Sequence, residues 1–140
     1  MAPDGSGFST AGAGIEWHTP TLSGPAPSVM SMEALMQAIP DPVFVHDHSG
    51  RFLEVNDHAC ESLGYTRTEL LKLNVMDIER DFDLEKAQAM WNTVKPNGRM
   101  AIDGHHKRKD GTVFPVRIHF GLLDYFGHRL YIGVVREAVA

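Results

Sequence analysis

Apolar and polar side chains alternate along residues 112–123 of this chain. The apolar ones share one face of the run: Phe114, Val116, Ile118, Phe120 and Leu122. Arg117 and His119 fall on the opposite face, which gives the period of two typical of a strand with one buried side. The run therefore predicts a long β-strand that packs one face on a core.

Turn residues place this strand in two successive hairpins. Before it stands Asp110-Gly111, in which glycine supplies the positive φ that a tight hairpin needs. After it, residues 124–128 form the predicted second turn. The expected partners are strands at residues 99–108 and 129–136, and such short links require antiparallel pairing.

A shorter hairpin is predicted earlier in the chain. Residues 43–47 and 51–55 are apolar runs of strand length, and Ser49-Gly50 lies between them. The two hairpin regions bracket a stretch of helical pattern, and this arrangement is the most informative feature of the sequence.

Start and stop signals of helices mark the stretch between the hairpins. Asn56 is a favourable N-cap for residues 57–63, and Gly64 is placed to end that helix. Thr66 and Glu69 have the spacing of a capping box, in which each side chain bonds the other residue's amide. Two short helices are therefore expected here.

A longer helix is predicted to begin at Asp83 and to end before Pro96-Asn97-Gly98. Its apolar side carries Leu84, Ala87, Met90, Trp91 and Val94. An aromatic residue at helical spacing usually packs in a core, and we interpret Trp91 in this way.

One more helix is predicted before the first hairpin, over residues 31–39, with Ser31 as its cap and Pro40 as its stop. Its apolar stripe has the spacing i, i+3, i+4 and i+7: Met32, Leu35, Met36 and Ile39. The stripe either covers the edge of the domain's own core or forms a homodimer contact, because either packing buries the same face.

These elements indicate an α+β fold with a five-stranded antiparallel sheet and short helices on one face. The predicted organisation is a disordered leader or linker over residues 1–30, the flanking helix over 31–39 and one domain over 40–138. The leader is assigned on composition, because Gly, Pro, Ser, Ala and Thr cannot bury enough apolar surface to offset the entropy of ordering.

The charge and composition of the 140 residues exclude several classes of protein. A net charge of −5 argues against nucleic acid as a partner, and no apolar run is long enough to span a bilayer. All 13 Lys and Arg stand at Arg51 or later, so a basic targeting signal at the start is not expected. Cys60 is the single cysteine, which fits a reducing compartment, and we expect a cytoplasmic protein.

Several short motifs together resemble those of the PAS domain family, from about Ile39 to Glu137. They are the turn at 47–51, Val55-Asn56 leading to Leu63-Gly64-Tyr65, the capping box at 66–69, Lys109-Asp110-Gly111-Thr112 with its alternating strand, and Gly133-Val134-Val135-Arg136-Glu137. The family usually ends in Arg-Asp-Ile-Thr, whereas this chain has Glu137 at the second position.

The resemblance implies a sheet wrapped by helices around a small cavity, in a signal-sensing and dimerisation module of a bacterial-type signal-transduction or transcription-regulatory protein. Such a module is not an enzyme. It passes its signal, as in two-component systems, to an effector such as a histidine kinase, a cyclase or a transcription regulator. The expected ligand is small and apolar or of mixed polarity, and a homodimer is the expected assembly.

From strand alternation and helix spacing we expect the cavity to be lined by Val55, Ile78, Met90, Ile102, Val116, Ile118 and Phe120. Relay of signals by protein contacts is the other mode of action that the sequence leaves open.

A haem- or flavin-bearing redox or gas sensor is the alternative function. The predicted long helix holds no histidine between Asp83 and Lys95, and Met90 is a weak candidate haem ligand. In flavin photoreceptors of this family a reactive cysteine lies in an Asn-Cys-Arg motif, whereas Cys60 lies in Ala-Cys-Glu on an earlier helix. We therefore favour no cofactor, with haem and flavin as the alternatives.

Two further clusters invite a metal site and are interpreted otherwise. The run His105-His106-Lys107-Arg108-Lys109 is too cationic to attract a divalent ion, and we interpret it as a solvated hairpin. The alternating acids from Asp77 to Glu85 lack the glycine and the final glutamate of a calcium loop. They predict a solvated acidic connector.

Overall fold

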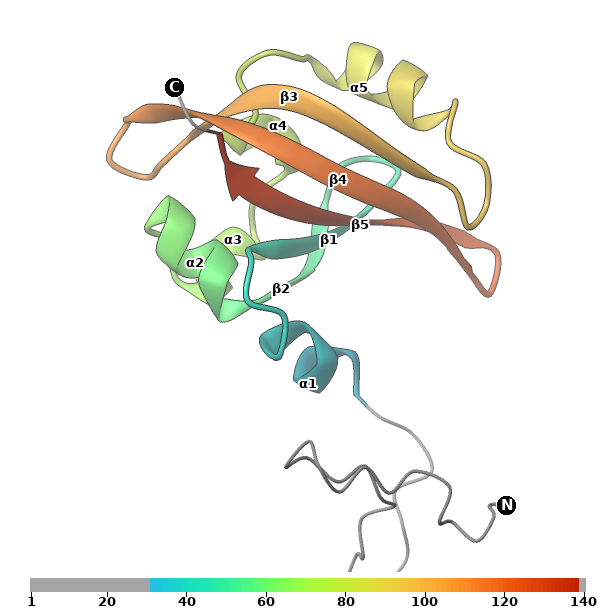
Figure 1. Ribbon diagram of the computed structural model, residues 1–140, viewed down its shortest axis with the longest axis horizontal. Helices are drawn as coiled ribbons and strands as arrows, with labels where there is room; N and C mark the ends of the chain where they lie inside the picture. Colours follow the sequence, from blue (N-terminus) through green and yellow to red (C-terminus); the bar gives the residue numbers. More distant parts are fainter. Residues whose placement is uncertain (1–30, 139–140) are drawn as a thin grey trace, which may run out of the picture. The chain divides into compact units, whose positions relative to one another are not determined.

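The computed structural model describes residues 31–138, and the leader predicted at 1–30 lies outside the described residues. The elements in chain order are α1 (Met32–Gln37), β1 (Val43–Asp47), β2 (Phe52–Val55), α2 (Asp57–Leu63), α3 (Arg67–Leu70), α4 (Val75–Ile78), α5 (Leu84–Trp91), β3 (Arg99–Lys107), β4 (Val113–Tyr125) and β5 (His128–Glu137). Figure 1 shows their arrangement.

The five strands form one antiparallel sheet in the order β2-β1-β5-β4-β3. β3, β4 and β5 follow one another as neighbours, and β5 then pairs with β1, with Phe44 opposite Gly133 and His46 opposite Tyr131. The first hairpin therefore joins the edge of the last three strands, and the α+β fold predicted from the sequence is confirmed.

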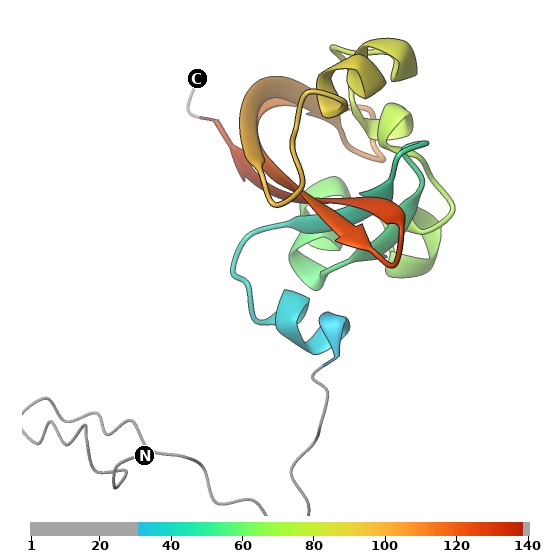
Figure 2. The same cartoon turned by 90° about the vertical axis from the view of Figure 1, so that its right-hand side faces the viewer.

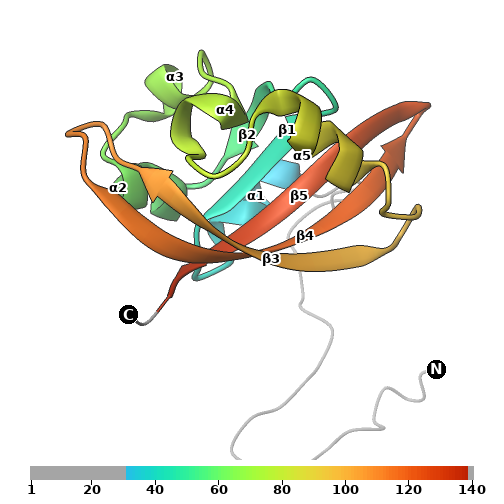
Figure 3. The same ribbon diagram turned by 90° about the horizontal axis from the view of Figure 1, so that it is seen from above.

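The curved sheet carries α2, α3, α4 and α5 on one side (Figure 3). α1 lies on the other side, and Figure 2 shows α1 and α5 with the sheet between them. Along β1, Phe44 and His46 face the side of the four helices, whereas Val43 and Val45 pack with Met36 of α1. The helices are thus on both sides of the sheet, and only those after β2 share one face.

Local capping chemistry starts the helices where the sequence predicts it. The side chain of Asn56 accepts from Ala59 N, Thr66 and Glu69 form a capping box, and Asp83 accepts from Lys86 N. Gly64 ends α2 in the left-handed conformation, with φ of 83°, which a side chain would strain.

The structure differs from the sequence prediction in three places. α5 ends at Trp91 rather than just before Pro96, although Trp91 and Val94 are still buried. α4 was not predicted, because four residues carry too little periodicity. In the structure Asn74 caps this helix, with Asp77 as the partner in a capping box. The turn between β4 and β5 has only two residues, Phe126 and Gly127, both at positive φ.

Candidate functional site

A small cavity of about 50 Å³ lies between the sheet and α4. Its lining comes from α4 and all five strands: Phe44, His46, Phe52, Val75, Ile78, His106, Ile118, Phe120, Gly133 and Val135. Among these ten described residues, two have polar side chains, His46 and His106. A molecule in this cavity would contact every strand of the sheet.

His46 is buried between two aromatic rings. Its ring centroid lies 4.6 Å from that of Trp91 and 5.2 Å from that of Tyr131. Nδ1 lies 2.9 Å from the carbonyl oxygen of Asp47, to which it donates, so that in the neutral ring Nε2 is an acceptor. Burial lowers the pKa of His46 to about 4, which keeps the imidazole neutral near pH 7.

The aromatic cluster extends from His46 toward the surface. Nδ1 of His48 lies 2.8 Å from the hydroxyl of Tyr131, and its ring lies 6.1 Å from that of Trp91. The side-chain amide of Gln88 donates to the carbonyl of His48 at 2.8 Å. These contacts fix α5 against the first hairpin, and they confirm the interpretation of Trp91 as a core residue.

His106 is the second buried imidazole. Its ring lies edge-on to Phe44 and Phe114, with centroid distances of 6.3 and 6.2 Å. Nε2 lies 3.7 Å from Oε1 of Glu79, which is longer than a hydrogen bond. Burial lowers the pKa of His106 to about 4, so this ring is also neutral near pH 7.

Glu79 is a buried carboxyl beside this histidine. Its Oε2 accepts from the amides of Arg80 and Asp81 at 3.0 and 2.9 Å. Gly104 of β3 leaves the space that it fills, because a Cβ there would lie 3.1 Å from Oε1. Burial raises the pKa of Glu79.

Two predictions are wrong at one residue each. The basic run was expected to be a solvated hairpin, but His106 is 4% exposed, because it has the same strand parity as the inward Gly104. The acidic run was expected to be a solvated connector, but Glu79 is 6% exposed. The alternation of β3 could have identified His106, whereas nothing local distinguishes Glu79 from its acidic neighbours.

The seven residues predicted to line a pocket are distributed over two core clusters. Ile78, Ile118 and Phe120 line the cavity. Val55 and Val116 are buried in the cluster beneath α2 and α3, while Met90 and Ile102 pack against the cluster around Trp91. Binding of a ligand by any of them stays a prediction.

The stripe of α1 is divided between two environments. Met36 is buried against Val43, Val45 and Leu130, and Ile39 packs at the margin of the same cluster. Met32 and Leu35 are 41% and 52% exposed. The stripe therefore covers its own domain with Met36 and Ile39, and the dimer contact stays a prediction.

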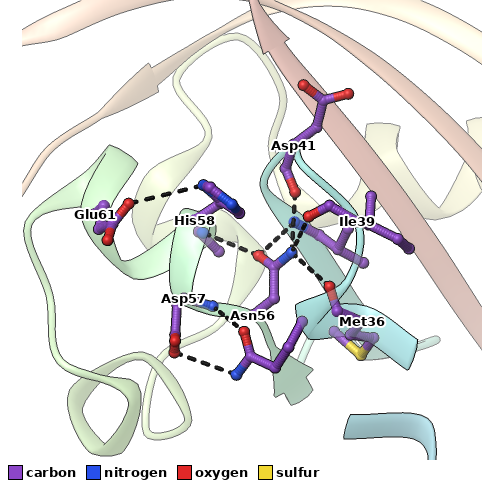
Figure 4. Close-up of polar contacts among 10 residues, drawn as sticks. Met36, Ile39, Asp41, Asn56, Asp57, His58 and Glu61 are labelled. Carbon is purple, nitrogen blue, oxygen red and sulfur yellow. Dashed lines mark hydrogen bonds and ion pairs between the residues drawn. The ribbon is translucent and has the colours of Figure 1, made fainter. Parts of the chain in front are cut away.

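Asn56 connects α1 to the rest of the domain (Figure 4). Its Nδ2 donates to the carbonyls of Met36 at 3.0 Å and Asp41 at 2.9 Å, while Oδ1 accepts from the amides of Val43 and Ala59. A second link joins Gln37 to the amide and the side chain of Asp57. One buried side chain thus holds α1, the start of β1 and the start of α2 together.

The last residues of β5 form ion pairs with the segment before β1 and with the β3–β4 turn. Arg136 Nε lies 3.1 Å from Asp41 Oδ2, just before β1. Glu137 Oε1 lies 3.5 Å from Arg108 Nη2, at the end of the β3–β4 hairpin. Glu137 therefore still has a cationic partner although it departs from the family's usual aspartate.

Cys60 and His58 of α2 are the remaining candidate reactive groups. Burial raises the pKa of the Cys60 thiol, so the reactive thiolate is disfavoured. His58 contacts Glu61 on the exposed side of α2, with 3.7 Å between Nδ1 and Oε1.

Within residues 31–138, no three His, Cys, Asp or Glu side chains are grouped so as to bind a metal ion. None of the helices described is both long and apolar enough to span a membrane.

Comparison with known proteins identifies the fold. The family model described as "PAS domain" matches residues 40–137, which contain the whole sheet, the cavity and α2–α5. The chain belongs to the PAS domain family. The resemblance noted in the sequence is therefore confirmed.

Individual PAS proteins are similar over most of the chain. The PAS domain of an HTR-like protein from Haloarcula marismortui has a TM-score of 0.70 and 28% identity, covering 76% of this chain and 88% of that one. The PAS domain of a two-component sensor histidine kinase has a TM-score of 0.67 and 25% identity, covering 76% and 92%.

A methyl sulfide methyltransferase-associated sensor from Methanosarcina acetivorans is 23% identical over 128 residues, which is 91% of this chain. The chain spans only 13% of the length of that sensor. The similarity therefore concerns one PAS-sized part of a much longer protein.

Proposed function

We propose that this PAS domain is the sensory module of a signal-transduction protein and binds a small ligand in the cavity beside α4. The observation that supports this most directly is the composition of the lining. Six elements contribute side chains to a cavity of about 50 Å³, and eight of its ten residues are apolar or glycine. Filling it would change the packing of α4 against the sheet.

The volume restricts the ligand to a few non-hydrogen atoms. Pockets for drug-sized ligands are typically about 300–1,000 Å³. A haem or flavin would have to displace α4 and α5 from the sheet, including the contacts of Trp91 with His46 and Tyr131. The geometry thus favours a small ligand over the alternative of a cofactor-bearing sensor.

We propose that the signal leaves the domain through α1 and through the end of β5. Phe44 and His46 line the cavity, while Val43 and Val45 on the same strand pack under α1. A change in β1 would therefore act directly on α1, whose other attachments are the bonds to Asn56 and those between Gln37 and Asp57. Histidine kinases are the favoured class of effector, because a PAS domain similar to this one belongs to a sensor histidine kinase.

A homodimer through α1 is part of the same proposal. Met32 and Leu35 are the large apolar side chains of α1 that stay exposed. Beside α1, an open groove crosses the outer face of the sheet and is lined by Ala101, Ile132 and Val134 among others. The exposed apolar side chains of α1 in a second copy would cover the apolar lining of this groove.

Xenon is a suitable probe of the proposed cavity, because apolar cavities take up this uncharged atom. We expect xenon to shift the methyl NMR signals of Ile78, Ile118 and Val135, and to alter hydrogen exchange of the α1 amides. In Gly133→Ala, the new methyl lies 3.7 Å from Ile118 Cγ2, in ordinary contact, and occupies the cavity without strain.

The variant and its control separate filling from damage. Gly133→Ala should remain folded and lose the xenon shifts. Ile132→Val, one residue earlier and on the opposite face of β5, should keep them. Equal xenon shifts in Gly133→Ala, or none in the original protein, would overturn the proposed site.

A further inference from the structure

The two buried imidazoles indicate what kind of molecule the cavity accepts. A cavity lined only by apolar groups selects by size alone, whereas each buried polar group requires a partner of matching chemistry. His46 and His106 are 7% and 4% exposed, and both line the cavity.

His46 has a defined hydrogen-bonding role. Its Nδ1 donates to the carbonyl of Asp47, and the rings of Trp91 and Tyr131 on either side fix its orientation. The remaining nitrogen, Nε2, can then only accept a hydrogen bond in the neutral ring. A ligand that donates would complement this atom, and one that only accepts would leave it unpaired.

The rest of the lining disfavours a charged ligand. Phe44, Ile78, Ile118 and Phe120 offer no hydrogen bonds to replace the water around an ion. The carboxyl beside His106, that of Glu79, is already bonded to two backbone amides. His106 lies between two phenyl rings and adds a second neutral group that can donate or accept.

We propose that the cavity binds a small uncharged molecule with a hydroxyl or N–H group that donates to Nε2 of His46, while its apolar part packs against Ile78, Ile118 and Phe120. This inference rests on the proposed function of the cavity and adds the chemical class of its ligand. Short-chain alcohols have the required size and chemistry.

Ethanol and dimethyl ether test the inference, because they are isomers of nearly equal volume and only ethanol donates. NMR titration of the protein with each should show ethanol binding about tenfold or more tightly, as expected for one unmatched buried acceptor. Ethylammonium, which donates but carries a charge, should bind more weakly than ethanol.

His46→Phe keeps a ring between Trp91 and Tyr131 and removes the acceptor. It should abolish the preference for ethanol over the ether while xenon binding persists. If this variant fails to fold, the ratio of affinities in the original protein decides alone.

The outcomes distinguish the two proposals. Xenon binding together with equal affinity for ethanol and ether would overturn the donor requirement and leave the cavity as a site. An ethanol preference that persists in folded His46→Phe would overturn the role of His46. The absence of binding by xenon, ethanol and ether alike would overturn both proposals.

Discussion

Nε2 of His106 lies 3.7 Å from Oε1 of Glu79, with both side chains buried between β3 and the segment that follows α4. Burial shifts both pKa values toward the neutral form, downward for the imidazole and upward for the carboxyl. Two ionisable groups of opposite type therefore contact each other without the charge–charge attraction of an ion pair.

The lowered imidazole pKa values predict that the protein loses stability in mild acid. Between pH 6.5 and about 4, His46 and His106 bind protons in the unfolded chain but not in the folded one. The free energy of unfolding therefore has its full value, as far as these two groups are concerned, above pH 6.5, and it decreases as the pH falls through this window. The raised pKa of Glu79 acts in the opposite sense above pH 4.5 and offsets part of the slope.

His106→Phe tests the histidine contribution. Urea unfolding at several pH values should show a smaller loss of stability toward pH 4, by on the order of 3 kcal/mol at most. His119→Phe on the exposed side of β4 is the matched control and should leave the slope unchanged. An unchanged slope in His106→Phe would contradict the assignment.

Gly104→Ala is expected to destabilise the fold by about 1–3 kcal/mol. The new Cβ would lie 3.1 and 3.2 Å from the carboxyl oxygens of Glu79, which two amides hold in place. Glu79→Ala should relieve this crowding, so the double variant should be more stable than the sum of the single losses predicts. If the stability losses of the two single variants in urea unfolding simply add in the double variant, the Glu79 carboxyl is not the group that the new Cβ crowds.

Asn56→Asp is expected to release α1 while α2 remains capped. The aspartate keeps an oxygen for the amides of Val43 and Ala59 but places another against the carbonyls of Met36 and Asp41. Hydrogen exchange of the α1 amides should become faster than that of α2. Asn92→Asp at the exposed end of α5 is the control, and equal protection of α1 in both variants would be evidence against the role of Asn56.

Leu35→Glu is expected to shift a homodimer toward monomer. Leu35 is 52% exposed on α1, so the substitution adds charge to the proposed contact and leaves the domain's own packing intact. Light scattering after size-exclusion chromatography measures the mass. Glu33→Gln on the same helix is the control, because it changes the charge of α1 and keeps the hydrogen bond between Gln37 and Asp57. A dimer of unchanged mass in Leu35→Glu would eliminate this contact.

The sequence by itself determined the elements whose cause is local. Asn56, Gly64 and the Thr66–Glu69 box start or end helices through bonds to residues within four positions, so their effect is visible in a short window. The alternation from Phe114 to Leu122 likewise determined which face of β4 is buried. These signals were sufficient for the α+β class and for the PAS resemblance.

The tertiary structure decided which apolar residues enclose a cavity and which fill the core. Val55 and Ile78 are both buried apolar residues, but only Ile78 lines the cavity, because α4 places it beside residues of all five strands. His106 and Glu79 meet because the segment after α4 pairs with β3, more than twenty residues later in the chain. Burial of polar groups depends on such long-range contacts, and a sequence window does not contain them.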